Sequence, residues 1–109
     1  MIAVSNPSKP PKTYREFIGR YPKLGKAWDL IGEAGQEGPL DARTRRLVKL
    51  GVAMGAMRTG AVRSGVRKAV DMGISREEVE QVVALAAGTI GMPSAVACFT
   101  WIEESLPSE

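Results

Sequence analysis

The stretch AVDMGISREEV, from Ala69 to Val79, contains a stop signal for one helix and a start signal for the next. Gly73 can adopt the left-handed backbone conformation that ends many helices. Ser75 and Glu78 have the spacing of a capping box, in which the two side chains bind the first free amides of a new helix. The stretch therefore predicts one helix that ends at Gly73 and another that begins just after Ser75.

Upstream of Gly73, apolar residues recur at three- and four-residue steps, which is typical of amphipathic helices. One helix begins near Gly60, and its apolar stripe lies opposite Arg63, Arg67 and Lys68. An earlier helix, with Asp41 as its N-cap, is apolar almost all round, so we expect it to be the most buried one. The apolar residues of this earlier helix are Leu47, Val48, Leu50, Val52, Ala53, Met54, Ala56 and Met57.

Downstream of Ser75 the same spacing predicts two more helices. The first has five small or branched apolar residues facing inward, and GTIGMPS (88–94) is expected to break it. Pro93 then begins a last helix. The inward residues are Val79, Val82, Val83, Ala86 and Ala87 in the first, and Val96, Ala97, Trp101 and Ile102 in the last.

The N-terminal part predicts one long and one short helix. An amphipathic helix begins at Pro22 and ends in the turn residues GQEGPLD (35–41), and a short helical turn covers residues 14–17. Residues 1–12 are rich in Pro, Ser and Lys and predict a flexible arm, and residues 13–109 predict a single helical domain. The fold class is thus all-α, a bundle of five to six helices. Because so short a chain cannot cover every apolar face, we also expect a homo-oligomer.

The composition excludes several kinds of chemistry within the chain. It has no histidine, the side chain used most often for acid–base catalysis and for binding transition metals, and a single cysteine, Cys98. No dithiol pair, multi-cysteine zinc site or Ser-His-Asp triad can form. We find no sequence pattern for a cofactor or a metal. Gly-rich GVAMGAMRTG (51–60) follows no strand and lacks nucleotide-binding spacing, so close packing explains it better.

The charge and hydropathy patterns argue against two kinds of partner. The formal net charge of +3 comes from scattered Lys and Arg without aromatic interleaving, which disfavours nucleic-acid binding. The N-terminal residues lack the apolar run of a signal peptide, and no segment is long and apolar enough to cross a membrane. We therefore expect a cytoplasmic protein without a membrane or nucleic-acid partner.

Three segments together resemble the carboxymuconolactone decarboxylase family, which includes the alkyl hydroperoxide reductase D-like proteins. These segments are GPLDARTRRLV (38–48), AVDMGISREEV (69–79) and GTIGMPSA (88–95), and the resemblance extends from about Tyr21 to Glu104. All three consist of turns, caps and packing residues rather than reactive groups. The resemblance implies an all-helical bundle that assembles into homotrimers or homohexamers, with active sites near subunit interfaces.

The resemblance also implies where reactive residues would stand. Counted back from Gly73, the peroxidase-type branch would have a glutamate at Arg46, two cysteines at Arg58 and Ala61, and a histidine at Gly65. The lactone-decarboxylating branch would have its histidine at Gly65 and a glutamate at Ala61. None of these reactive residues is present, so the resemblance supports the fold and leaves the activity open.

Two interpretations of these positions stay open. In one, Gly65 and Ala61 allow close packing, and the protein is a binding or scaffold oligomer without the family's activity. In the other, Arg46 and Arg58 form a cationic pocket for a small carboxylate- or phosphate-bearing ligand, since the arginine fork makes paired hydrogen bonds to anions. An enzyme acting on a small carboxylate or lactone would be built on the same two arginines.

Three other residues are candidates for chemistry. Glu33 could be a general base if burial raised its pKa, although a surface charge is the simpler role. Cys98 could be the thiol of an antioxidant protein or pair with a partner's cysteine, although a small buried residue is the commoner case. Lys49 could be a reactive amine or a lysine whose stem lies on apolar surface.

Overall fold

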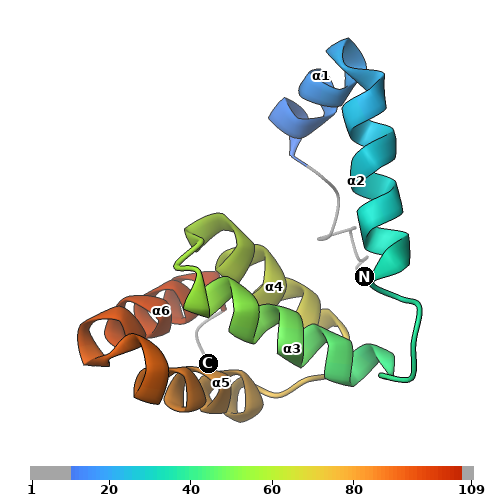
Figure 1. The fold of residues 1–109 in the computed structure, drawn as a ribbon. Coiled ribbons are helices and arrows are strands. Elements are labelled where there is room, and N and C mark those ends of the chain that lie inside the picture. Colours follow the sequence, from blue (N-terminus) through green and yellow to red (C-terminus); the bar gives the residue numbers. More distant parts are fainter. Residues whose placement is uncertain (1–10, 107–109) are drawn as a thin grey trace, which may run out of the picture. The chain divides into compact units, whose positions relative to one another are not determined.

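The computed structural model describes residues 11–106, and within this range the chain forms six α-helices and no strand (Figure 1). The prediction of an all-helical fold is confirmed for these residues. Residues 1–10 of the predicted arm lie outside the described part. The helices are α1 (Lys12–Arg20), α2 (Pro22–Ala34), α3 (Ala42–Gly55), α4 (Thr59–Asp71), α5 (Arg76–Ile90) and α6 (Met92–Ser105).

The helices belong to two compact units, divided between Asp41 and Ala42. In the first unit α1 packs against α2, with the rings of Phe17 and Tyr21 5.6 Å apart. Gly25 is the one buried residue among those described in this unit, because Ile18 packs over it. A Cβ at position 25 would lie 3.2 Å from Cβ of Ile18. The apolar face of α2, with Trp28 and Ile31, is exposed. The helical turn predicted at residues 14–17 is part of the longer α1.

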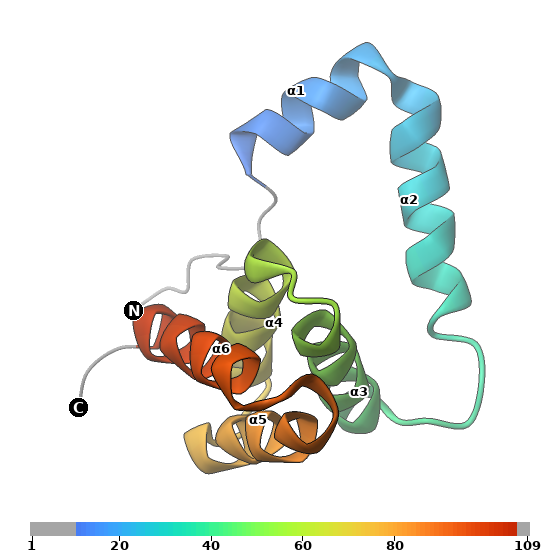
Figure 2. The ribbon, with the colours of Figure 1, turned by 60° about the vertical axis from the view of Figure 1, so that its left-hand side comes forward.

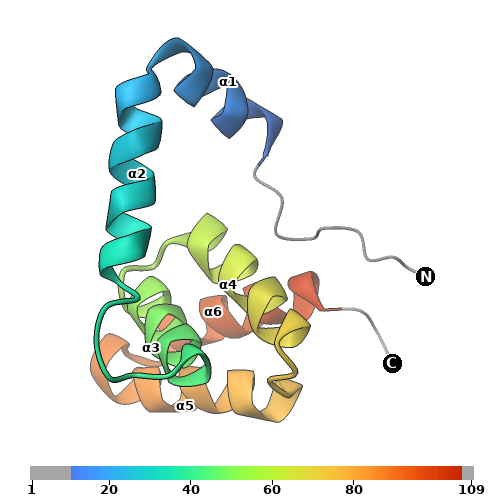
Figure 3. The ribbon, with the colours of Figure 1, turned by 90° about the vertical axis from the view of Figure 1, so that its right-hand side faces the viewer.

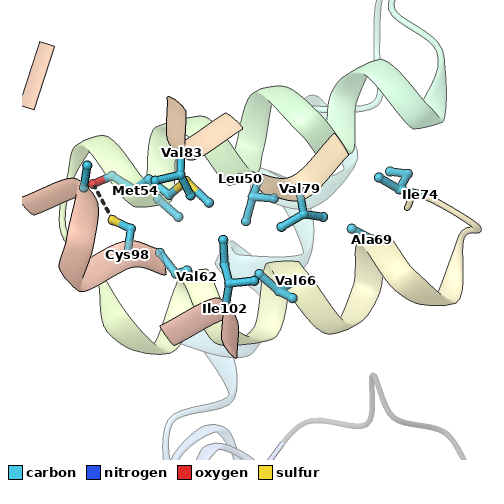
Figure 4. Packing of buried hydrophobic residues seen from close by; sticks show 12 residues of the cluster. Leu50, Met54, Val62, Val66, Ala69, Ile74, Val79, Val83, Cys98 and Ile102 are labelled. Carbon is cyan, nitrogen blue, oxygen red and sulfur yellow. Dashed lines mark hydrogen bonds between the residues drawn. The ribbon is translucent and has the colours of Figure 1, made fainter. Parts of the chain in front are cut away.

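In the second unit, α3, α4, α5 and α6 form a four-helix bundle (Figures 2 and 3). α3 packs against α4 and α5, and α6 packs against the same two helices from the other side. Their inward side chains form a single apolar core (Figure 4). Its buried members are Leu50, Ala53, Met54, Val62, Val66, Ala69, Ile74, Val79, Val83, Ala95, Cys98 and Ile102.

Ion pairs connect the helices of this bundle at its surface. Arg43 of α3 pairs with Glu78 of α5, and Arg63 of α4 pairs with Glu104 of α6. Arg76 of α5 lies 3.0 Å from Glu103 of α6. Exposed pairs of this kind contribute little because water screens them, so burial of the core stabilises the bundle more than they do.

The turn between α4 and α5 has the form that the sequence predicts. Ile74 N donates to Ala69 O (3.0 Å) and Gly73 N donates to Val70 O (2.9 Å), with Gly73 at φ 83°, which is a Schellman motif. Ser75 Oγ then accepts from Glu78 N, and the Glu78 carboxylate accepts from Ser75 N. Both the helix stop and the capping box are confirmed.

The turn between α3 and α4 repeats the Schellman pattern without a glycine. Arg58 N donates to Ala53 O and Met57 N donates to Met54 O, each at 3.0 Å. Met57 therefore occupies the left-handed position, at φ 55°, which costs a residue with a Cβ about 1–2 kcal/mol. This turn ends α3 at Gly55. Ala56 and Met57 were expected to belong to the helix and instead lie outside it.

One expectation about burial is wrong, and another is confirmed only in part. α3 is not the most buried helix, because Val48 and Val52 are 50% and 65% exposed, whereas α4 has four buried residues. On α6 the expected packing face is confirmed at Ile102, which is buried, and at Trp101, which packs on the core. The other buried residues are Ala95 and Cys98, while Val96 is 54% exposed. The physical reason is the same in both helices: α3 and α6 each contact two neighbours, and the side facing neither of them stays uncovered in the single chain.

The break between α5 and α6 is shorter than predicted. Gly88, Thr89 and Ile90 belong to α5, and only Gly91 separates the two helices. Gly91 makes the break by itself because it takes φ 89°, a conformation that other residues rarely adopt. In the part of the chain that the structure describes, no helix has the length and apolar character needed to cross a bilayer.

Candidate functional site

Arg46 and Gly65 lie against each other where α3 packs on α4. A Cβ placed on Gly65 would be 3.1 Å from Cδ1 of Leu50 and 3.9 Å from Nη1 of Arg46. Both positions were expected to carry reactive residues on the basis of the family resemblance, and the fold brings them into contact. The missing side chain of Gly65 leaves space that Leu50 and the Arg46 guanidinium occupy.

The Arg46 side chain is half-buried, and its Nε is shielded from solvent without a hydrogen-bond acceptor. Burial lowers the pKa of this guanidinium from its ordinary value. Arginine nevertheless stays protonated at neutral pH. The chain therefore holds a positive charge between two helices with one of its donors unused.

Arg46 is one of three cations whose charges act on Lys68. The pKa of the Lys68 ammonium is lowered first by burial and then by the positive charges of Arg46, Lys49 and Arg67. Arg46 and Lys49 are one turn apart on α3, and Arg67 and Lys68 are neighbours on α4. We call these four residues the cationic cluster. Lys68 is half-buried, and Lys49 and Arg67 are exposed.

Arg58 is the N-cap residue of α4, and Asp71 is the last residue of the same helix. Gly65 lies seven positions further along the chain than Arg58, which corresponds to roughly 10 Å along the helix axis. Arg58 is exposed, as is Ala61 one turn later. Among the described contacts none joins Arg58 to Arg46, and the charge of Arg46 acts on Lys68.

Glu33 lies in the first unit, near the end of α2, and is exposed. Its backbone carbonyl accepts from Gln36 N at 3.0 Å.

Cys98 lies in the core, fully shielded from solvent (Figure 4). Its Sγ is 3.9 Å from the Met54 carbonyl oxygen and 3.9 Å from Sδ of Met57. Burial raises the pKa of the thiol above its ordinary value. Since the thiolate is the nucleophile, this environment suppresses the reactivity of Cys98.

A groove of about 580 Å³ runs between α3 and α5 on the outside of the bundle. It is mostly apolar, and Leu85 is 72% exposed there. We call it the α3–α5 groove. Its lining residues are Leu47, Val48, Gly51, Gly55, Glu78, Gln81, Val82, Leu85, Ala86, Thr89 and Ile90.

The described chain is thus a small all-helical protein in which positions 46 and 65 lie close together. The family model of the carboxymuconolactone decarboxylase family matches residues 22–104, and the chain belongs to this family. No match was found among curated proteins or among solved structures. The comparisons therefore give the family and leave the activity to be argued from the site.

Sequence reasoning missed Lys68 and the α3–α5 groove. Lys68 follows Gly65 by three residues, so it lies on the neighbouring part of the same helical face, and this spacing was the available signal. The groove had a weaker signal. Residues 47–57 are apolar on nearly every side of the helix, which suggested deep burial. In the single chain, those that face away from the core line the surface of the groove.

Proposed function

We propose that the protein is a homo-oligomeric binding protein of its family that works without thiol or histidine chemistry. The contact between Arg46 and Gly65 is the observation that carries the proposal. The family resemblance implies a glutamate and a histidine at these two positions, and the chain has a permanent cation and a residue without a side chain. This pair cannot exchange protons at neutral pH, but an arginine suits the binding of an anion.

An enzyme with a remodelled site is the second candidate, and the cationic cluster favours it. In such an enzyme Arg46 would stabilise negative charge that develops on an oxygen of a small carboxylate or lactone. The cluster contains no carboxylate that could act as a general base. The candidate base Glu33 lies on α2 and is exposed in the single chain. Glu33 and Arg58 would therefore have to act from outside the cluster.

The third candidate, an antioxidant protein that uses Cys98, has the least support. A peroxidatic thiol needs access to solvent and a lowered pKa, and the surroundings of Cys98 provide the opposite of both.

Turnover assays with the wild type, Arg46→Ala and Cys98→Ser separate the three candidates. The assays follow hydroperoxide consumption with a supplied dithiol and the decarboxylation of small carboxylated lactones. A binding protein gives rates equal to the protein-free control in all three cases. Turnover that disappears in Arg46→Ala would favour the remodelled enzyme, and turnover that disappears in Cys98→Ser would favour the thiol protein.

The homo-oligomer is part of the proposal, and the α3–α5 groove is the surface that supports it. Its apolar lining includes Val48 and Leu85, both at least half exposed in the single chain. Covering apolar surface yields roughly 25 cal/mol per Å². We propose that a second copy of the chain covers this groove, within a trimer or hexamer.

A charge placed in the groove should weaken the oligomer. Leu85→Glu would bury a carboxylate at the contact, so we expect a smaller species than the wild type in sedimentation velocity at the same concentration. Val70→Glu on α4 is the control, because Val70 is an exposed apolar residue outside the groove lining. Equal sedimentation of wild type and Leu85→Glu would exclude the groove as the interface.

A further inference from the structure

The first unit has too small a core to be stable by itself. Its helices α1 and α2 have 9 and 13 residues, and Gly25 is the one buried residue among those described in them. Helices of this length are marginal in water unless an apolar face is packed. Units of fewer than about 40 residues usually need oligomerisation or another aid to fold. The exposed face of α2 therefore needs a cover from outside the unit.

The apolar residues of α2 form a stripe on one side of the helix. Leu24, Trp28 and Ile31 follow one another at steps of four and three residues, and all three are exposed in the single chain. We call them the α2 stripe. This spacing is the one by which an amphipathic helix anchors itself in an apolar groove. Leu30 lies about 100° around the helix from Ile31 and is outside the stripe.

The α3–α5 groove matches the α2 stripe in length and in character. Its lining on α5 extends from Glu78 to Ile90, about 18 Å along the helix axis, and α2 is about 20 Å long. The groove is mostly apolar and lies between two helices, so a third helix can pack along it. Trp28 offers the largest side chain of the stripe to such a groove, and a tryptophan buries about 150–250 Å².

The stripe and the groove belong to the same chain, and both are exposed in the single chain. A partner of a different kind would cover one of them and leave the other in water. If the α2 helix of each copy enters the groove of another copy, both surfaces are covered at once. This exchange closes in a pair of copies or in a ring, as expected of a finite homo-oligomer.

We propose that the α2 stripe of one copy packs into the α3–α5 groove of a second copy. Trp28 is the central anchor of this contact, and Leu24 and Ile31 lie one turn before and after it. The inference rests on the homo-oligomer of the proposed function and names the segment that fills the groove.

Two neighbouring residues of α2 provide a matched test in sedimentation velocity. Ile31→Asp would bury a carboxylate at the contact and should raise the dissociation constant of the oligomer about tenfold or more. Leu30→Asp introduces the same charge beside it, at a residue that is 63% exposed where Ile31 is 62% exposed, and should leave the dissociation constant unchanged. Equal effects of the two variants would overturn the proposal.

Cross-linking with a short bis-maleimide tests the contact with all three anchors in place. Two chains of different mass carry Cys98→Ala, and each has one new cysteine, so every link joins two chains. Ala27→Cys on α2 should link to Gln81→Cys or Thr89→Cys, which mark the two ends of the groove. Val70→Cys, exposed outside the groove lining, is the control and should give no link. Urea unfolding identifies any variant that fails to fold.

Other occupants of the groove give different products. Links only between two Ala27→Cys chains would mean that α2 helices pair with each other. A chain with both Ala27→Cys and Gln81→Cys, diluted into chains without cysteine, would link within itself if its own α2 filled the groove. Either result would overturn the proposal.

The oligomer and its α2 contact can fail separately. If Leu85→Glu weakens the oligomer and Ile31→Asp does not, the groove stays an interface and α2 is excluded as its occupant. A wild type that sediments as a monomer would overturn the oligomer itself, and with it this contact.

Discussion

At the scale of single residues, Glu78 illustrates how one carboxylate serves two parts of the fold. It accepts a hydrogen bond from Ser75 N within the capping box, at 2.9 Å, and it pairs with Arg43 of α3. The hydrogen bond from Arg43 is the larger cause, and that from Ser75 N the second, of a pKa below the ordinary 4.5. The start of α5 is thereby linked to the start of α3.

The lowered pKa predicts a specific acid sensitivity. Because the folded state binds this proton more weakly than the unfolded state, Glu78 contributes stability above its unfolded pKa and loses it as the pH falls through the folded value. In urea unfolding between pH 7 and pH 3, the difference in free energy of unfolding between wild type and Glu78→Gln should therefore shrink on acidification. A difference that stays constant with pH would show that the charge of Glu78 makes no contribution.

Arg46 shows how far chemistry can be inferred from one residue. The family resemblance singled out positions 46 and 65, and the structure brings them into contact. The identity of the other neighbours depends on how α3 rotates against α4, which no local pattern specifies. For this reason the link between Arg46 and Lys68 comes from the structure and not from the sequence, and the pocket of Arg46 and Arg58 stays a prediction.

At the scale of elements, caps and stops were the features most readily predicted, because each is set by a few adjacent residues. Gly73, Ser75 and Glu78 form the turn between α4 and α5 as expected. The turn at Met57 was not foreseen, since a methionine in the left-handed conformation has no sequence signal and is held there by two backbone hydrogen bonds.

The capping box predicts the effect of a small deletion. Ser75→Ala removes the acceptor for Glu78 N and should lower the free energy of unfolding by about 1 kcal/mol. Ser64→Ala, in the middle of α4, removes the same atom without touching a cap and should be neutral or slightly stabilising. Equal losses in the two variants, measured by urea unfolding, would contradict a capping role for Ser75.

The faces of the helices were harder to predict than their ends. Periodicity identifies which residues share a side of a helix but not which side a neighbour covers. On α6 the buried residues are Ala95, Cys98 and Ile102, and Val96 of the expected face points outward. Burial on a helix with two partners is a property of the packed bundle, and only the packed bundle reveals it.

At the scale of the whole molecule, two apolar surfaces have no cover within their own units. One is the face of α2 with Trp28 and Ile31, and the other is the α3–α5 groove. The expectation of an oligomer arose from a count of helices against chain length, and these surfaces agree with it. The oligomer itself remains a prediction, which the Leu85→Glu experiment tests.

The buried thiol of Cys98 offers a way to measure how often the core of the bundle opens. The 109 residues contain no other cysteine, and this one becomes accessible to a disulfide reagent only when the four-helix core separates. The labelling rate of the unmodified protein should therefore follow the opening of the core and rise as urea is added. Rapid labelling under native conditions, unaffected by urea, would show that the thiol is reached without opening. Cys98, which is poorly suited to catalysis, is thus well suited to measuring the opening of the four-helix core.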